Sequence, residues 1–317
     1  MKPDYLDQYR QSDGDLRCVA SAAPRTMFVS LNSPEPYFVK LSYPMVLGRF
    51  SSPLTLRKAK DSLGLSEYIK QTLIDCDAEI SWFQETGFVS ADLFEGIGPI
   101  GQSVCIFRNL LPDTKNGTVE MPDAIVPLFS LMARDYSPIV ADFIEPPAGK
   151  SLVDHIWESV LLPLIDSVFL FISEFGLIPE PHAQNVVLYK DRVSGELKIA
   201  WRDALSFKIL SRHERIAGIN SSWGRTVDDP ENEVVELSCS LDGMFDEYIL
   251  VPLITKVRSL SDGSAELRHR TRAVIRDWIG TSKLEFPVDG WYNRDSSPIE
   301  PGQKLKPDFI RGRSGIR

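Results

Sequence analysis

The stretch from Leu152 to Ile172 constrains the fold most, because its apolar side chains cover more of a helix surface than a solvent-facing helix would carry. Ser151 is a good N-cap for such a helix, and Asp154 follows it by three residues. Pro163 lies inside the stretch and should kink the helix. With 317 residues, 43% of them apolar, the chain can build one large or two modest domains around this buried helix.

A short loop and a β-hairpin are predicted directly after this helix. The helix should end at Gly176, because Pro179 and Pro181 push the residues before them out of the helical region. Residues 185–189, N-V-V-L-Y, are typical of a strand, and residues 191–195 have turn chemistry before a second strand-like run.

This hairpin should gather polar side chains at one spot. Its second strand leads to Asp203, which would return to the vicinity of His182 and Asn185. Glu180 and Gln184 lie in the same loop, so a carboxylate, an imidazole and two amides would meet there. Each residue alone also has an ordinary structural explanation, as a turn residue or as half of an Arg-Asp ion pair.

The spacing of these residues resembles a known signature, that of the siderophore synthetases that work without a nonribosomal peptide template, the aerobactin-synthetase (IucA/IucC-like) family. The matching pattern is Glu180-x-His182-x-Gln184-Asn185, followed after the hairpin by Arg202-Asp203. The H-x-Q-N core is weak alone, and its position between a long apolar helix and a hairpin that closes on R-D makes it more specific. The resemblance covers roughly residues 20–210.

Segments nearer the N-terminus match the same family in the same order. There, the Arg and Thr of an S-x-R-T segment and the Lys of a K-L-S segment approach the nucleotide phosphates and the carboxylate substrate. Arg25, Thr26 and Lys40 occupy these places here, although Ala23 replaces the expected serine. Without the resemblance, a lysine in an apolar strand is best explained as an edge-strand or snorkelling residue.

Two further arginine positions bear on the same comparison. Arg108-Asn109 resembles the family's R-E-N segment with the glutamate replaced; a surface arginine at a strand end is the alternative. The family's I-T-N-x-x-R segment has no clear counterpart in residues 46–57, which lack the asparagine and offer both Arg49 and Arg57. The sequence leaves open which arginine would bind the carboxylate.

The resemblance implies a ligase that uses ATP and Mg²⁺ to activate a citrate-type carboxylate as an acyl-adenylate, from which an amine or hydroxyl displaces AMP. Such a site must screen a triphosphate and a carboxylate, which calls for several cations and oxygen ligands. The implied catalytic residues are Arg25, Lys40 and His182; those for the nucleotide are Arg25, Thr26, Lys40, Arg108, Gln184, Asn185 and Asp203; those for the metal are Glu180, Asn185 and Asp203. We expect the nucleotide between the Arg25/Lys40 strands and the hairpin.

Two other functions compete with this one. A small-molecule kinase also carries a His, then an Asn at a strand start, then an Asp after the next strand, but it would need a catalytic aspartate near His182 and a glycine-rich loop. A non-catalytic relative could bind a carboxylate-rich ligand or a partner subunit.

Composition limits the partners and the compartment. The net charge of −9 argues against nucleic acid and anionic lipid. Neither a signal peptide nor an uninterrupted membrane-length apolar run is evident, so we expect a cytoplasmic protein that does not enter membranes. The four cysteines are scattered without metal-binding or disulfide spacing.

The predicted fold is α+β, a mostly antiparallel sheet with a β-hairpin at the site, packed against a largely helical C-terminal half. The expected parts are a polar segment (1–17), an α+β nucleotide-binding part (18–135), a helical part with the hairpin (136–295) and a disordered basic tail (296–317). Further helices are predicted over 66–74, 124–143, 244–260 and 265–279, strands over 80–88 and 104–107, and loops over 112–123 and 220–236. Family members are longer at the N-terminus, so we expect a homo-oligomer or a separate partner subunit.

Overall fold

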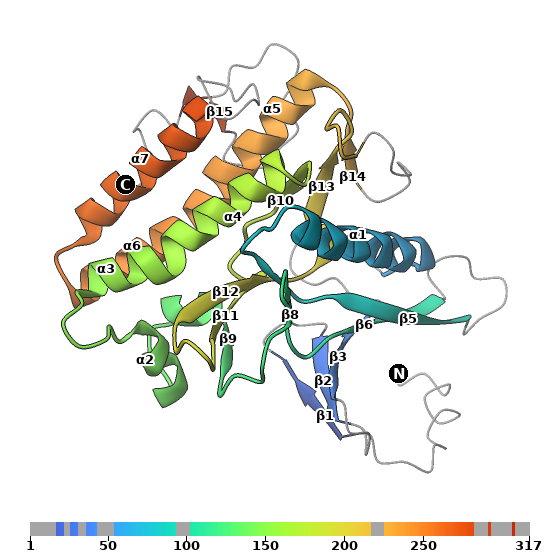
Figure 1. Cartoon of the computed structure of the whole chain (residues 1–317), viewed down its shortest axis with the longest axis horizontal. Helices are drawn as coiled ribbons and strands as arrows, with labels where there is room; N and C mark the ends of the chain where they lie inside the picture. Colours follow the sequence, from blue (N-terminus) through green and yellow to red (C-terminus); the bar gives the residue numbers. More distant parts are fainter. Residues whose placement is uncertain are drawn as a thin grey trace, which may run out of the picture. The chain divides into compact units, whose positions relative to one another are not determined.

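The computed structural model describes residues 17–21, 26–30, 36–42, 54–92, 102–216, 225–281, 291–292 and 306–307 (Figure 1). The chain divides into two compact units. The first unit comprises residues 1–59 and 86–110, and the second comprises residues 60–85 and 111–317.

The first unit is built on a five-stranded sheet with the strand order β1-β2-β3-β6-β5. The strands are β1 (Arg17–Ala20), β2 (Thr26–Ser30), β3 (Tyr37–Leu41), β5 (Glu85–Asp92) and β6 (Gln102–Arg108). β1, β2, β3 and β6 pair antiparallel in turn. Edge-to-face pairs, Phe28 with Phe38 (ring centroids 6.0 Å apart) and Tyr37 with Phe107 (5.3 Å), join neighbouring strands.

The second unit contains a six-stranded mixed sheet in the order β8-β7-β4-β12-β11-β9. Its strands are β4 (Ser81–Trp82), β7 (Asp113–Thr114), β8 (Gly117–Thr118), β9 (Ile125–Pro127), β11 (Val186–Lys190) and β12 (Leu197–Trp201). β11 and β12 form the expected hairpin, in register from Val186↔Trp201 to Lys190↔Leu197. At its turn, Asp191 Oδ1 accepts the backbone N–H of Val193 (3.0 Å) and Ser194 (2.7 Å), because an aspartate can cap its own turn in this way.

Smaller elements complete this unit. A second sheet has the order β10-β13-β14, with β10 (Leu177–Pro179), β13 (Phe207–Leu210) and β14 (Arg225–Val227); β15 (Trp291–Tyr292) pairs with β16 (Lys306–Pro307). The short helices are η3 (Leu128–Met132), α2 (Pro138–Ile144) and η5 (Ala204–Ser206).

The apolar stretch forms the central helix of the second unit, a continuous run of α3 (Leu152–Ile156), η4 (Trp157–Leu161) and α4 (Leu162–Ser173). Ser151 caps it, accepting the backbone N–H of Asp154 (3.0 Å). The disturbance expected at Pro163 takes the form of the π-helical segment η4, which lies immediately before it. Val160, Leu164 and other side chains from all three segments are fully buried, as the pattern predicted.

Four C-terminal helical segments, with α1 (Leu56–Asp75), supply the rest of the helical structure: α5 (Pro230–Ser238), η6 (Cys239–Leu250), α6 (Val251–Leu260) and α7 (Ser264–Thr281). α7 runs alongside α3 and α4 of the central helix in Figure 1, and α6 packs against α7 and η3. Phe169 of α4 stacks on Trp278 of α7 with ring centroids 5.4 Å apart, and Trp278 Nε1 donates to Asp166 Oδ1 (2.9 Å). These contacts hold α7 to the central helix.

The α+β class and the hairpin are confirmed, and several local predictions are wrong. Residues 125–127 form β9 where a helix was expected, because the segment pairs with β11. The expected loop at 112–123 contains β7 and β8, and α5 begins at Pro230 inside the other expected loop. The predicted strand at 80–88 is two strands, β4 and β5. The predicted tail lies outside the described residues apart from 306–307.

The helix Leu152–Ser173 is long and apolar enough to cross a membrane by length and composition. In the structure, 61% of its most apolar window is buried, as expected of the core helix of a globular unit.

Gly176 links the central helix to β10 at φ +64°, and a Cβ atom there would lie 2.6 Å from His213 Cγ and 2.8 Å from Ile216 Cγ1. Gly176→Ala should therefore destabilise the fold by about 2–4 kcal/mol, combining left-handed strain with overpacking. Gly195 is the matched control, because its φ is +71° and no heavy atom lies within 4 Å of a Cβ there. Gly195→Ala should cost only about 1 kcal/mol, as urea denaturation can measure, and equal losses would contradict the role of the close approach.

Candidate functional site

The loop before the hairpin is held by its own backbone. His182 N–H donates to Glu180 O (2.7 Å), and Asn185 N–H donates to His182 O (2.7 Å). Glu180 N–H donates to Ser206 O (3.1 Å), which attaches the loop to the segment after the hairpin. The loop conformation is therefore set by main-chain hydrogen bonds.

The end of β12 closes on this loop, as the sequence predicted. Arg202 N–H donates to Asn185 O (3.0 Å), and Arg202 Nε donates to Gln184 O (2.9 Å). Arg202 thus has a backbone-anchoring function that the sequence did not reveal. The structure brings Glu180, His182, Gln184, Asn185 and the Arg202-Asp203 pair into one local assembly, which we call the H-x-Q-N site.

Asp203 has an uncommon backbone conformation for a residue other than glycine, with φ 74° and ψ 82°. Its carbonyl accepts hydrogen bonds from Ser206 Oγ (2.7 Å) and Ser206 N–H (2.9 Å), which stabilise the turn. Aspartate tolerates the left-handed region better than most residues, but glycine would be the least strained choice. Such conformations concentrate at functional sites, so this one supports a functional hypothesis for Asp203.

The His182 imidazole is fixed in orientation. Its Nδ1 accepts the backbone N–H of Gln184 (3.1 Å), so the neutral ring carries its proton on Nε2. Burial lowers the pKa of His182 below its ordinary value, which also favours the neutral ring. The ring packs against Tyr248 with centroids 4.9 Å apart. Sequence patterns could not identify Tyr248, because it is one aromatic residue in a segment whose sequence has an ordinary helical pattern.

The oxygen donors at the H-x-Q-N site suit a hard cation. Asn185 Nδ2 donates to Glu180 O (3.3 Å), and Asn185 Oδ1 has no hydrogen bond to any described residue. Amide and carboxylate oxygens are the protein ligands that Mg²⁺ prefers, and Asn185, Asp203 and Glu180 carry such oxygens in their side chains. Among the described residues, no group of three or more His, Cys, Asp and Glu side chains is placed to hold a metal.

The predicted basic residues lie in the first unit. Thr26 is opposite Lys40, and Lys40 is opposite Ile106, two residues before Arg108. Because residues opposite each other, or two apart on one strand, share a sheet face, Thr26, Lys40 and Arg108 project from the same face. Their exposed fractions are 5%, 5% and 3%.

Four other positions named from the sequence contribute little to the described site. Arg25 and Arg49 lie outside the described residues. Arg57 is exposed in the first turn of α1, and Asn109 follows β6 half-buried.

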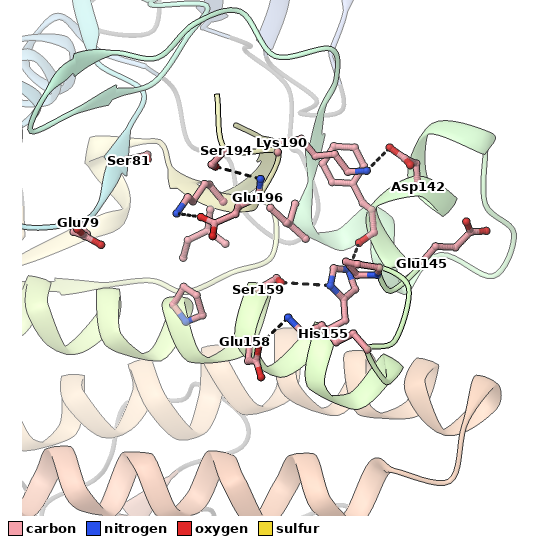
Figure 2. A pocket seen from close by; sticks show the side chains of 18 residues that line it. Glu79, Ser81, Asp142, Glu145, His155, Glu158, Ser159, Lys190, Ser194 and Glu196 are labelled. Atoms are coloured by element: carbon pink, nitrogen blue, oxygen red, sulfur yellow. Dashed lines mark hydrogen bonds and ion pairs between the residues drawn. The ribbon is translucent and has the colours of Figure 1, made fainter. Parts of the chain in front are cut away.

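A cavity of about 480 Å³ lies elsewhere in the second unit, lined by α2, the central helix and the hairpin (Figure 2). None of the predicted site residues lines it. Its three lysines are already paired: Lys150 with Glu158 (2.7 Å), Lys190 with Asp142 (2.6 Å) and Lys198 with Glu196 (2.7 Å). Glu79 and Glu145 also line it, so carboxylates outnumber amines and a triphosphate or citrate would be repelled.

His155 lies at the wall of this cavity and is 6% exposed. Its Nε2 lies 3.1 Å from the Phe143 carbonyl oxygen, and its Nδ1 lies 3.4 Å from Ser159 Oγ; Figure 2 shows His155 and Ser159 facing each other. Its burial makes this histidine part of the packing and not a solvated side chain.

No protein-family model matches the sequence, and no curated protein is significantly similar to it.

Solved structures of siderophore synthetases are similar in fold. Aerobactin synthetase IucC from a hypervirulent pathotype of Klebsiella pneumoniae aligns with a TM-score of 0.61 and 10% identity, over 83% of this chain and 46% of that one. IucA from the same source aligns with a TM-score of 0.57 and 15% identity, over 84% and 48%. The petrobactin biosynthesis protein AsbB from Bacillus anthracis Sterne gives 0.51 and 16%, over 85% and 48%. At these identities the similarity shows a shared fold, and the chain spans about half the length of these proteins.

The buried His155 should make stability depend on pH. Burial, the largest cause, and the charges of Lys150 and Lys190 lower its pKa below 6.5, while the Phe143 carbonyl and Glu158 act in the opposite direction. Its contribution is therefore complete above pH 6.5 and is lost as the pH falls from there towards the lower pKa of the folded protein. His155→Gln should lose less stability than the wild type between pH 7 and pH 5, measured by urea denaturation.

His269→Gln is the control for this pH series, since His269 is exposed on α7. Its profile should follow the wild type. His182 is present in all three proteins, so its own titration cancels in the comparison.

Proposed function

We propose that this chain is a siderophore-synthetase-like, ATP-dependent ligase that activates a citrate-type carboxylate as an acyl-adenylate for condensation with an amine or hydroxyl. The observation that carries the proposal is the H-x-Q-N site itself, in which Arg202 fastens the Gln184-Asn185 segment to the strand end that bears Asp203. The fold shared with IucC, IucA and AsbB supports it.

The proposed reaction has two steps. A carboxylate oxygen of the substrate attacks the α-phosphorus of ATP and displaces pyrophosphate, giving the acyl-adenylate. The amine or hydroxyl then attacks the acyl carbon, displaces AMP and releases a proton. Both steps depend on positioning and on screening of negative charge more than on proton transfer by the protein.

In this proposal the second unit supplies hydrogen-bond donors and oxygen ligands. His182 donates from Nε2 to an anionic oxygen of the substrate or nucleotide, because its Nδ1 is occupied by the Gln184 N–H. Asn185, Asp203 and Glu180 would hold Mg²⁺, which would supply charge screening at the phosphates. Gln184, which precedes Asn185 in the chain, would add a polar contact to the nucleotide.

The basic residues that the proposal assigns to the phosphates belong to the first unit. Lys40 and Arg108 project with Thr26 from one face of the sheet, and Arg25 directly precedes β2 in the sequence. Arginine suits forked contacts to phosphate oxygens, and lysine provides a point charge. These side-chain types suit an anionic ligand at this face. An ATP-bound structure of IucA, 16% identical over 81% of this chain, supports ATP as that ligand.

Product analysis tests the proposal directly. With Mg·ATP, citrate and a panel of amines, the protein should release AMP and pyrophosphate in equal amounts, and pyrophosphate release should require the carboxylate. Release of ADP with a phosphorylated product would establish the kinase alternative. Nucleotide binding without turnover would identify a non-catalytic binding subunit.

The contribution of Asp203 can be tested by ligand-linked stability. Mg·ATP at 100 times its Kd should stabilise the wild type by about 2.7 kcal/mol, and Asp203→Asn should remove most of the Mg²⁺-dependent part of the resulting Tm increase. Asparagine also tolerates the left-handed backbone, so the variant should fold.

Asp142→Asn is the matched control, because Asp142 is a surface carboxylate paired with Lys190 at 2.6 Å and lies away from the H-x-Q-N site. It should respond to Mg·ATP as the wild type does. If Asp203→Asn unfolds while the wild type shows no Mg²⁺ dependence, Asp203 has only a structural role as an ion-pair partner.

A further inference from the structure

Tyr248 contacts the H-x-Q-N site without belonging to its sequence motif. Its ring centroid is 4.9 Å from that of His182, with 33° between the ring planes. The side chain is 45% exposed, so it is not a core residue whose position follows from burial alone. Its contact with His182 therefore needs its own explanation.

The helical segment that carries Tyr248 is fastened both to the core and to the loop of the site. Phe245 and Ile249 of η6 are 1% and 0% exposed and belong to the main hydrophobic core. Near the start of η6, buried Ser240 Oγ donates to Pro179 O (2.6 Å), just before Glu180. The segment is π-helical over Cys239–Leu250, a rare geometry that is frequent at functional sites. Tyr248 is thus held in place relative to the loop.

The contact is made by the Tyr248 ring, which is tilted against the imidazole. Its hydroxyl has no hydrogen bond to any described residue, so the phenol oxygen does not explain the position of the side chain. His182 is held at one edge by the Gln184 N–H, and its Nε2 has no hydrogen bond to any described residue. A single hydrogen bond leaves the imidazole able to tilt about that bond, whereas a packed aromatic face restricts the tilt.

We propose that Tyr248 is a positioning residue: its ring keeps the His182 imidazole in the orientation that presents Nε2–H to a bound anionic oxygen. The importance of this orientation for turnover rests on the ligase activity proposed above, but the positioning itself does not. Because the ring makes the contact and the hydroxyl has no hydrogen bond to a described residue, phenylalanine should replace Tyr248 and non-aromatic residues should not.

Three variants test this proposal. Tyr248→Phe keeps the ring, Tyr248→Leu keeps apolar bulk without the ring, and Leu260→Ala removes an exposed apolar side chain, 52% exposed on α6, as the control. The first readout is the ¹H and ¹⁵N NMR signals of the His182 ring, assigned by comparison with His182→Gln. Tyr248→Leu should move the ring-proton shifts and broaden the Nε2–H signal, whereas Tyr248→Phe and Leu260→Ala should keep both close to the wild-type values.

The second readout is turnover, measured as pyrophosphate release. An aromatic pair contributes about 0.5–1.5 kcal/mol of interaction energy. Its loss in Tyr248→Leu should lower kcat by roughly 2- to 12-fold and leave the KM for ATP unchanged. Tyr248→Phe should retain wild-type kcat. If the His182 signals of folded Tyr248→Leu match those of the control variant, or if Tyr248→Phe alters them as strongly as Tyr248→Leu does, the positioning role is refuted. A wild type without turnover would refute the ligase proposal, and the NMR comparison would still decide the role of Tyr248.

Discussion

Burial of the central helix is the constraint on which the second unit depends. The helix is apolar around most of its circumference, so other elements must surround it. β12 is fastened directly to it, because Trp201, fully buried, donates from Nε1 to Ser167 Oγ (2.8 Å). The next residue in the chain is Arg202, which closes on the H-x-Q-N loop. The position of the candidate site thus follows from the packing of a core helix.

Local sequence signals predicted this part of the structure well, because its determinants are local. The Pro179 and Pro181 restrictions, the turn at Asp191 and the Ser151 cap each act within a few residues. The predictions failed where a distant partner decides: Ile125–Pro127 becomes a strand only through pairing with β11. The start of α5 has a local signal, because Asp229 caps the helix and Pro230 occupies its first turn. This segment was nevertheless expected to be part of a loop.

At the candidate site, too, the features set by nearby residues were predicted and those set by distant residues were not. The hairpin length predicted that Asp203 would return to the vicinity of Asn185, and in the structure its neighbour Arg202 donates to Asn185 O. The motif could not predict that Tyr248, far along the chain, packs on His182, because nothing in an amphipathic helical pattern tells a ring that faces a histidine from one that faces solvent. Arg202 was interpreted as a possible ion-pair partner of Asp203, and its anchoring of Gln184 O depends on side-chain geometry that spacing does not encode.

The H-x-Q-N site and the larger cavity differ in whether their charged and polar groups already have partners within the protein. In the cavity, each lysine is neutralised by a carboxylate of the protein, so binding an anion there would require an existing ion pair to break. At the H-x-Q-N site the main-chain groups bond within the loop and to Ser206 and Arg202, while His182 Nε2 and Asn185 Oδ1 have no hydrogen bonds to the described residues. A fixed donor and a fixed acceptor on a loop held by main-chain bonds need little reorganisation to meet a ligand, and the proposed ligase activity would use this preorganisation for charge stabilisation.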